Sequence, residues 1–145
     1  MAIRPVQGVA DIRRCAPILV AAFNESPFTS RWTTKSAIAR LTEVYKTGKE
    51  YCFLDVGKDG VVGFVFCSTK EWDQGTHLTV QHLIVHEASR SKGIGSKLLK
   101  KAEKEAKARG IIAMDLTTNV SGPGAEFWRK RDFRPTGYIQ MSKTL

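Results

Sequence analysis

The chain has 145 residues, of which 42% are hydrophobic and 26% are charged, a balance typical of one globular domain with a buried core. Its apolar runs fall well short of the ~20 residues that a membrane span needs, and its first residues lack the apolar core of a signal peptide. We therefore expect a single domain over residues 1–145, in the cytoplasm and without a membrane partner. Three widely spaced cysteines among apolar neighbours (Cys15, Cys52, Cys67) predict buried free thiols, with neither a disulfide framework nor a metal site.

Charge is concentrated in one part of the chain. Lys and Arg number 23 against 14 Asp and Glu, a net charge of +9, which favours an anionic partner or a solvated basic surface. Residues 86–110 alone hold eight basic and three acidic side chains. Three of the basic side chains (Arg90, Lys92, Lys97) flank a pair of glycines, so we expect these three to lie near a bound anion.

The first half of the chain predicts a short strand, two helices and a hairpin. Apolar residues recur at helical spacing from Ile12 to Phe23, and Thr33 or Thr34 is a suitable cap for a second helix. Gly57–Gly60 lies between two β-rich runs and is a hairpin signal. The expected elements are, in chain order, a strand at 2–6, helices at 9–23 and about 34–46, and strands at 50–56 and 61–68.

The second half predicts a strand, a crossover helix and a returning strand. Leu98, Leu99, Ala102 and Ala106 mark the apolar face of the crossover helix, which ends at Gly110. A strand–helix–strand crossover implies a parallel pair inside an otherwise antiparallel sheet. The expected elements are strands at 76–85 and 111–118, helices at 94–109 and about 123–130, and one or two closing strands in 133–145.

The chemistry is concentrated where the strand at 76–85 leads through Arg90-Ser91-Lys92-Gly93-Ile94-Gly95 into the basic helix. Glycines let the backbone turn tightly and approach a ligand, and the start of a helix presents unpaired N–H groups and a partial positive charge. Together these features indicate a cradle for a pyrophosphate. A dinucleotide-binding domain would place the glycines after the first strand, with an acidic residue about 20 positions later. This chain does neither.

Residues 80–133 resemble the GCN5-related N-acetyltransferase (GNAT) superfamily. The resemblance rests on a hydrophobic strand (82–85), Arg-x-x-Gly-x-Gly (90–95), a Leu-rich helix, a strand opened by Gly110, the pair Phe127-Trp128, and Asp132-Phe133. The order of elements extends the resemblance to about 2–145, and 23–27 with Trp32-Thr33 is similar to bacterial relatives of aminoglycoside 6'-N-acetyltransferases. It implies an α+β fold: a mostly antiparallel sheet of six to seven strands with a central parallel pair, and about four helices.

The resemblance also implies direct transfer of an acetyl group from acetyl-CoA to a primary amine, either a small molecule or a protein. In the family, backbone amides hold the pyrophosphate, and the strand before them pairs with the pantetheine arm. An asparagine further on also contacts the arm, and Ser121 could take that role here. Carried onto this chain, the donor-binding residues are Leu83, Ile84, Val85, Arg90, Ser91, Lys92, Gly93, Ile94, Gly95, Ser96, Asn119 and Trp128.

The groups that handle protons depart from the family pattern. Trp128 stands where many relatives carry a tyrosine acid, and Gln81 and Thr117 stand where relatives carry a glutamate base. Gln81 and His82 are the candidate catalytic residues, although strand alternation predicts that the two point to opposite faces of the sheet. Side chains that could reach the acceptor cleft from loops are Glu25, Asp73 and His77.

Three functions remain open at this point. The first is an acetyltransferase, and the second is a non-catalytic CoA-binding regulatory module, which the missing tyrosine and glutamate would suit. The third is a basic nucleic-acid-binding domain, which the charge suggests but no recognised motif supports. The sequence does not identify the acceptor amine. Dimers are common in the family, so a homodimer is also open.

Overall fold

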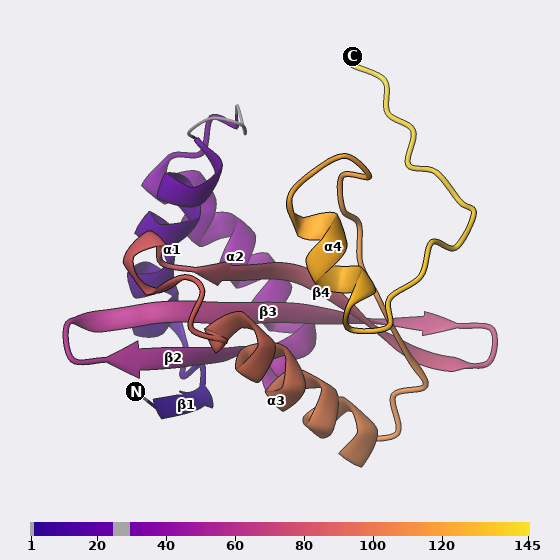
Figure 1. The fold of residues 1–145 in the computed structure, drawn as a ribbon, viewed down its shortest axis with the longest axis horizontal. Coiled ribbons are helices and arrows are strands. Elements are labelled where there is room, and N and C mark those ends of the chain that lie inside the picture. Colours follow the sequence, from indigo (N-terminus) through magenta and orange to yellow (C-terminus); the bar gives the residue numbers. More distant parts are fainter. Residues whose placement is uncertain (1, 25–29) are drawn as a thin grey trace.

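The computed structural model describes residues 2–24 and 30–145 (Figure 1). The elements expected before residue 131 are present, with shifts of a few residues at most of their ends. Their bounds are β1 Ala2–Pro5, α1 Val9–Phe23, α2 Thr34–Gly48, β2 Phe53–Gly57, β3 Gly60–Trp72, β4 Gly75–Val85, α3 Ile94–Ala108, β5 Ala113–Asp115 and α4 Gly124–Arg129. Two short 3₁₀ turns, Lys49–Tyr51 and Glu87–Ser89, complete the assignment.

The strands form one mixed sheet in the order β1-β2-β3-β4-β5. Every neighbouring pair is antiparallel except β4 and β5, which are parallel and are joined through α3. The predicted α+β class, the four helices and the parallel pair are therefore confirmed. The parallel pair lies at the edge of the sheet and not at its centre, because no strand follows β5 in the described sheet.

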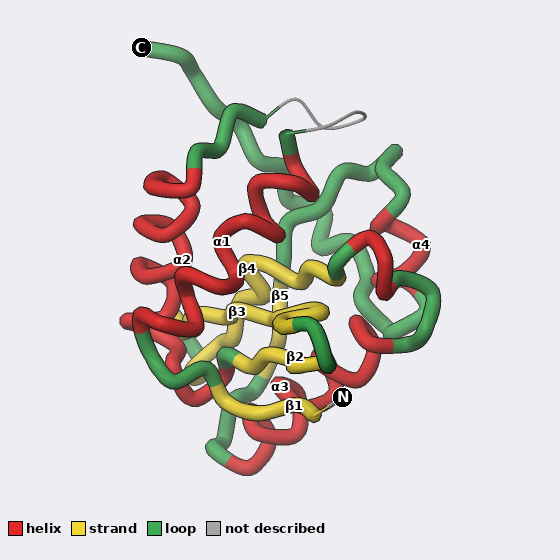
Figure 2. Tube along the Cα trace, turned by 90° about the vertical axis from the view of Figure 1, so that its left-hand side faces the viewer, coloured by secondary structure: helices red, strands yellow, loops and turns green. Residues whose placement is uncertain are grey.

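Helices cover both faces of the sheet (Figure 2). α1 and α2 bury Ile12, Leu19 and Leu41 against one face, and α3 buries Leu98 and Leu99 against the other. α2 starts where the sequence indicates, since the Thr33 side chain accepts from the backbone N–H of Ser36 at 3.0 Å in a reciprocal capping box. The loop that follows β4 passes in front of β3 to reach the start of α3 (Figure 1).

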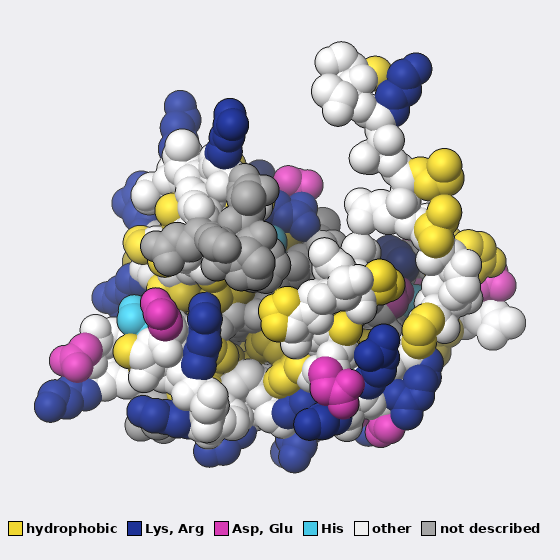
Figure 3. All heavy atoms as spheres, turned by 45° about the horizontal axis from the view of Figure 1, so that its top comes forward, with side chains coloured by type: hydrophobic (Ala, Val, Ile, Leu, Met, Phe, Trp, Pro, Cys, Tyr) yellow, Lys and Arg dark blue, Asp and Glu magenta, His cyan; other side chains and the backbone are white. Residues whose placement is uncertain are grey.

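The predicted closing strands are not formed: the sheet has five strands, whereas six to seven were expected. Pro135 has no N–H to donate, and Gly137 takes φ +90°, so the segment bends away from an extended path. Beyond it, Tyr138 and Met141 are 91% and 84% exposed. The C-terminal segment extends away from the body of the domain in Figure 1, and hydrophobic side chains line it in Figure 3. β5 is also shorter than predicted, because it pairs on one edge only.

A β-bulge in β4 changes which side chains share a face. Phe66 of β3 pairs with His82, and the next residue, Cys67, pairs with Val80, so Gln81 is an extra residue on β4. A bulge breaks the strict alternation of a strand. The prediction that Gln81 and His82 point to opposite faces is therefore wrong, since both side chains reach α2.

Candidate functional site: a split sheet edge beside a helix start

The two parallel strands separate midway along β4. Their register covers only three residue pairs, and the last of these joins Thr79 to Asp115. β4 continues to Val85 and pairs there with β3 alone. In the part of the chain that the structure describes, the outer edge of β4 over residues 80–85 thus has no strand partner. An unpaired edge can accept an extended ligand as an additional strand. Leu83, Ile84 and Val85, predicted to bind the donor, lie on this edge.

The turn from β4 into α3 has the conformation of an anion-binding loop. Arg90 Nε donates to the carbonyl oxygen of Val85 at 3.1 Å, which ties the turn to the strand end. Ser91 and Gly93 both take positive φ, at +66° and +78°. No side chain caps α3 at Gly93, so the first N–H groups of the helix, at residues 94–96, have no intrahelical acceptor. Lys92 is exposed beside them.

The start of α3 packs against α4. An added Cβ at Gly95 would lie 3.6 Å from Val85 Cγ2 and 3.7 Å from Phe127 Cζ, which is ordinary contact. Trp128 forms edge-to-face contacts with Phe127 and Phe133, with ring centroids 5.0 and 5.3 Å apart. Trp128 is therefore a packing residue at the edge of the core between α3 and the sheet.

Asn119 closes the turn that follows β5. Its Oδ1 accepts from the backbone N–H of Ser121 at 2.9 Å, and its carbonyl accepts from the N–H of Gly122 at 3.0 Å. The two residues predicted as alternatives for one role, Asn119 and Ser121, are therefore joined in one turn. The amide group of Asn119 remains free to donate.

Gln81 and His82 converge on Arg40 of α2. Arg40 donates from Nε to His82 Nε2 at 3.2 Å and from Nη2 to Gln81 Oε1 at 2.9 Å, and Gln81 donates in turn to Ser68 at 3.0 Å. Burial and the Arg40 charge together lower the pKa of His82 to about 4. At neutral pH the imidazole is uncharged, with its Nε2 lone pair occupied by the guanidinium.

Arg40 was not anticipated from the sequence. A weak signal was available, because the buried positions Ala37, Leu41 and Val44 place Arg40 at the border of the packed face of α2. A long side chain at such a border buries its stem and extends its head along the sheet. The signal does not specify what the head contacts.

A second polar cluster surrounds Asp115 at the start of the split. Its Oδ1 accepts from Thr79 Oγ1 at 2.7 Å, while Lys70 Nζ and His77 Nδ1 lie 3.1 and 3.2 Å from its Oδ2. Burial opposes ionisation of Asp115, but these hydrogen bonds outweigh it and hold the pKa of Asp115 below its ordinary value. Trp72 is 60% exposed and lies 6.1 Å from the His77 ring.

Two acceptor-side candidates remain, Asp73 and Glu25. Asp73 belongs to the turn between β3 and β4, and Glu25 lies outside the described residues, as do Ser26 and Pro27 of the 23–27 segment.

The three cysteines are free and buried, as predicted. Burial raises the pKa of Cys15 and of Cys52 to about 12 and raises that of Cys67 as well, so none is a thiolate at neutral pH.

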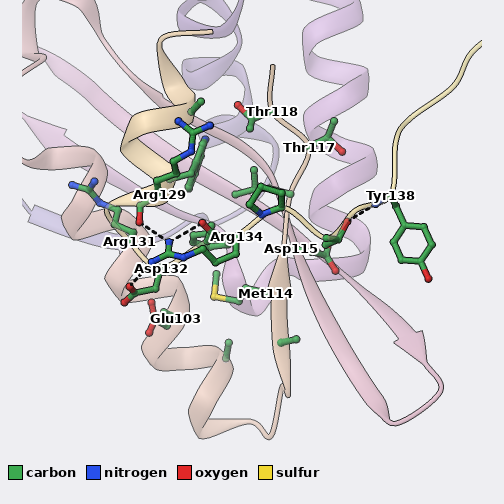
Figure 4. Close-up of a pocket in the computed structure, with 18 of the residues that line it drawn as sticks. Glu103, Met114, Asp115, Thr117, Thr118, Arg129, Arg131, Asp132, Arg134 and Tyr138 are labelled. Carbon is green, nitrogen blue, oxygen red and sulfur yellow. Dashed lines mark hydrogen bonds and ion pairs between the residues drawn. The ribbon is translucent and has the colours of Figure 1, made fainter. Parts of the chain in front are cut away.

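A pocket of about 760 Å³ lies beside β5, between α3, α4 and the C-terminal segment (Figure 4). Thr117 and Thr118 lie at one end of it and Tyr138 at its outer side. Of the predicted donor-binding residues, only Trp128 lines it. The pocket is therefore separate from the helix-start site, on the edge of β5 that no strand covers.

The domain combines three features: a parallel strand pair that separates, a glycine-containing turn, and a helix start beside that turn. Together they define the class of α+β domain to which this chain is assigned. Residues 18–133 match the Acetyltransferase (GNAT) family. The chain belongs to that family. It is 36% identical over 83 residues to the streptothricin acetyltransferase of Streptomyces lavendulae, an alignment that covers 56% of this chain and 43% of that relative. The chain thus spans less than half of the relative's length.

Solved structures share the fold over nearly the whole chain. A possible acetyltransferase from Clostridium difficile 630 matches with a TM-score of 0.82 at 16% identity, over 99% of this chain and 97% of that one. The ribosomal-protein-alanine N-acetyltransferase from Brucella melitensis biovar Abortus 2308 matches with a TM-score of 0.76 at 17% identity, over all of both chains. At such identities these likenesses concern the fold alone.

Proposed function

We propose that this protein is an N-acetyltransferase that transfers an acetyl group from acetyl-CoA directly to a primary amine. One observation carries the proposal: the unpaired edge of β4 leads, through the loop at 86–93, to a helix start whose first N–H groups have no intrahelical acceptor. A ligand with both an extended, amide-containing arm and a pyrophosphate suits that combination. Three buried free thiols also support a reducing compartment such as the cytoplasm.

The residues present fit the donor. The amides at 94–96, with exposed Lys92 and Lys97, offer positive charge for a pyrophosphate. The free edge at Leu83–Val85 offers backbone groups to the pantetheine arm. Gly93 has no protein atom within 4 Å of the position of an added Cβ, so the turn is open toward solvent where a phosphate would approach.

Transfer requires a neutral amine at the split between β4 and β5. As the new N–C bond forms and the C–S bond breaks, the nitrogen loses a proton and the sulfur gains one. A backbone N–H on the free edge of β4 can hold the oxyanion that develops on the thioester carbonyl. In this proposal Gln81 and His82 act by holding Arg40 beside the split, and water carries the proton, since neither group has a free basic lone pair there.

Calorimetry and thiol release test the proposal together. The full chain should bind acetyl-CoA and should liberate free CoA thiol when mixed with a suitable amine. No heat of binding for acetyl-CoA or for CoA would reject it. Binding without thiol release across amines, aminated antibiotics and peptides would favour a non-catalytic CoA-binding module.

A nucleic-acid-binding role is less well supported. In the face shown in Figure 3, Lys and Arg side chains are scattered around the rim and do not gather in one stripe. A gel shift that persists at moderate salt would favour this role, because nonspecific phosphate contacts weaken steeply with salt.

A further inference from the structure

Arg40 carries a charge that no hydrogen-bonded carboxylate matches among the described residues. Its two hydrogen bonds go to neutral acceptors, the amide oxygen of Gln81 and the imidazole of His82. The carboxylate of Glu43 lies 3.8 Å from Nη1, beyond hydrogen-bond distance, on a side chain that is 74% exposed. A guanidinium has five N–H donors. Among the described residues, Nη1 and one proton of Nη2 thus have no hydrogen-bond acceptor, and a ligand can supply one.

These free donors lie at the split of the sheet. Pairing between β4 and β5 ends at Thr79, and the two residues that hold Arg40 follow within three positions, on the part of β4 whose outer edge has no partner among the described strands. α2 covers the face of the sheet opposite α3. An amine that reaches the split on the α2 side would thus pass within reach of the guanidinium.

The other charges on this face do not suit a polycationic acceptor. Asp115 is the carboxylate nearest the split along β5, and both of its oxygens are engaged, by Thr79 on one side and by Lys70 and His77 on the other. Lys70 brings a second cation to the same face. An acceptor with several ammonium groups would meet two cations there, and an Asp115 that is already satisfied.

We propose that the acceptor is an amine bearing a carboxylate close to its amino group, and that Arg40 binds this carboxylate through its free Nη donors. The inference rests on the proposed acetyl transfer and narrows its substrate class to amino acids and similar amino carboxylates. The planar fork of arginine matches a carboxylate with two parallel hydrogen bonds. Gln81 and His82 already fix the orientation of the fork, so little side-chain freedom remains to be lost on binding.

A thiol-release assay with matched acceptor pairs tests the inference. Each common L-amino acid is compared with its own carboxamide. kcat/KM is calculated for the concentration of the uncharged amine, because the amino groups of the acid and of the amide differ in pKa. We expect the ratio of kcat/KM for the acid to kcat/KM for its amide to be tenfold or more for at least one amino acid. Arg40→Gln should bring this ratio to within threefold of one, and Arg40→Lys should lower it less. Lys46→Gln, which removes an exposed cation from the same helix, should leave it unchanged.

Two results would overturn the inference while leaving acetyl transfer intact: amides or diamines that match or exceed the acids, or a ratio that Arg40→Gln does not change. Thermal melts of all variants establish that they are folded.

If no amine releases thiol, the proposed acetyl transfer is rejected. The binding of amino acids and their amides to the protein then tests the role of Arg40 on its own. Saturation-transfer NMR with CoA present should show contact for an amino acid but not for its amide, with the signal lost in Arg40→Gln and retained in Lys46→Gln. Equal signals for acid and amide, or none for either, would contradict it.

Discussion

The Nε of Arg40 donates to the Nε2 of His82 at 3.2 Å, across the contact between α2 and β4. Because arginine can only donate, His82 must accept at Nε2 and carry its proton on Nδ1. The imidazole of His82, the candidate base on β4, is thereby held neutral and occupied. Its role in the proposed reaction is to position Arg40.

His82→Gln should change the rate but not the pH dependence of the reaction. The pKa of His82 is lowered to about 4, so the imidazole does not titrate between pH 6 and pH 9. We expect the acidic limb of kcat/KM to follow the acceptor amine, with the same midpoint in wild type and variant. The measurement is a pH–rate profile with one acceptor. An acidic limb near the ordinary histidine pKa that disappears in the variant would make His82 the general base.

His82 should also make the fold sensitive to mild acid. Its pKa is about 4 when folded and 6.5 for a free side chain, so between these values the unfolded chain binds more protons. The free energy of unfolding should therefore fall as pH drops from about 6.5 to about 4. Urea unfolding across this range should give a shallower decline in His82→Gln. Equal slopes in both proteins would show that His82 titrates normally in the folded state.

Most of the fold could be predicted, because the residues that begin, end and pattern each element lie within that element or next to it. α1 occupies the expected residues, and Thr33 caps α2 as its side chain predicts. Gly93 could be placed at a helix start with positive φ, since glycine is the residue that tolerates it. The predicted donor-binding residues at 83–85 and 90–96 depend on such local features, and they follow one another at the end of β4 and the start of α3. Asn119 and Trp128 lie elsewhere, in the turn after β5 and in α4.

The acceptor side could not be predicted, because it depends on register. The bulge at Gln81 is a property of strand pairing and leaves no mark in the sequence, yet it turns two side chains toward one arginine. The cluster at Asp115 likewise needs the parallel register of β4 and β5. The closing strands were expected from order and composition, but residues 133–145 form no ladder in the structure.

Gly93→Ala should weaken acetyl-CoA binding, and Gly110→Ala supplies the matched control. The two glycines flank the same helix, with φ of +78° and +79°, and neither has an atom within 4 Å of an added Cβ. Each substitution should cost roughly 1–2 kcal/mol of stability from left-handed backbone strain. Only Gly93 adjoins the free N–H groups, so only its variant should raise the Kd for acetyl-CoA, by about tenfold. Equal affinities in the two variants would place the pyrophosphate elsewhere.

Asp11→Asn should destabilise the protein because it breaks a partly buried ion pair between α1 and β1. The carboxylate is 4% exposed and accepts from Arg4 at 2.7 and 2.9 Å and from the N–H of Gln7 at 2.8 Å. We expect a loss of about 2–4 kcal/mol in urea unfolding. Arg14→Gln, which removes a partner 3.8 Å away on an exposed side chain, should cost about 0.5 kcal/mol or less.

The same contact predicts a second acid-sensitive range. The hydrogen bond from Arg4 is the main cause that lowers the pKa of Asp11 below its ordinary value, 3.8. The stability that ionised Asp11 contributes is therefore complete above that value, and it is lost as pH falls through the lower pKa of the folded state. Asp11→Asn should flatten the loss of stability below about pH 4 and leave the range assigned to His82 unchanged. A flattening between pH 4 and pH 6.5 would contradict this separation.

Residues 139–145 should exchange their amide hydrogens rapidly. The segment makes no strand pairing, and Ile139 and Leu145 have fully or largely exposed side chains, at 80% and 111%. Unpaired, solvated amides exchange without a structural opening, whereas the β4 amides that pair with β3 require one. Hydrogen exchange followed by mass spectrometry should show complete labelling here within seconds, with Ile84 as the protected reference. Deletion of residues 136–145 should then shift the Tm by only a few degrees. Slow exchange both here and along β5, together with a large fall in Tm on deletion, would instead establish a sixth strand on the free edge of β5, occupying the pocket beside it.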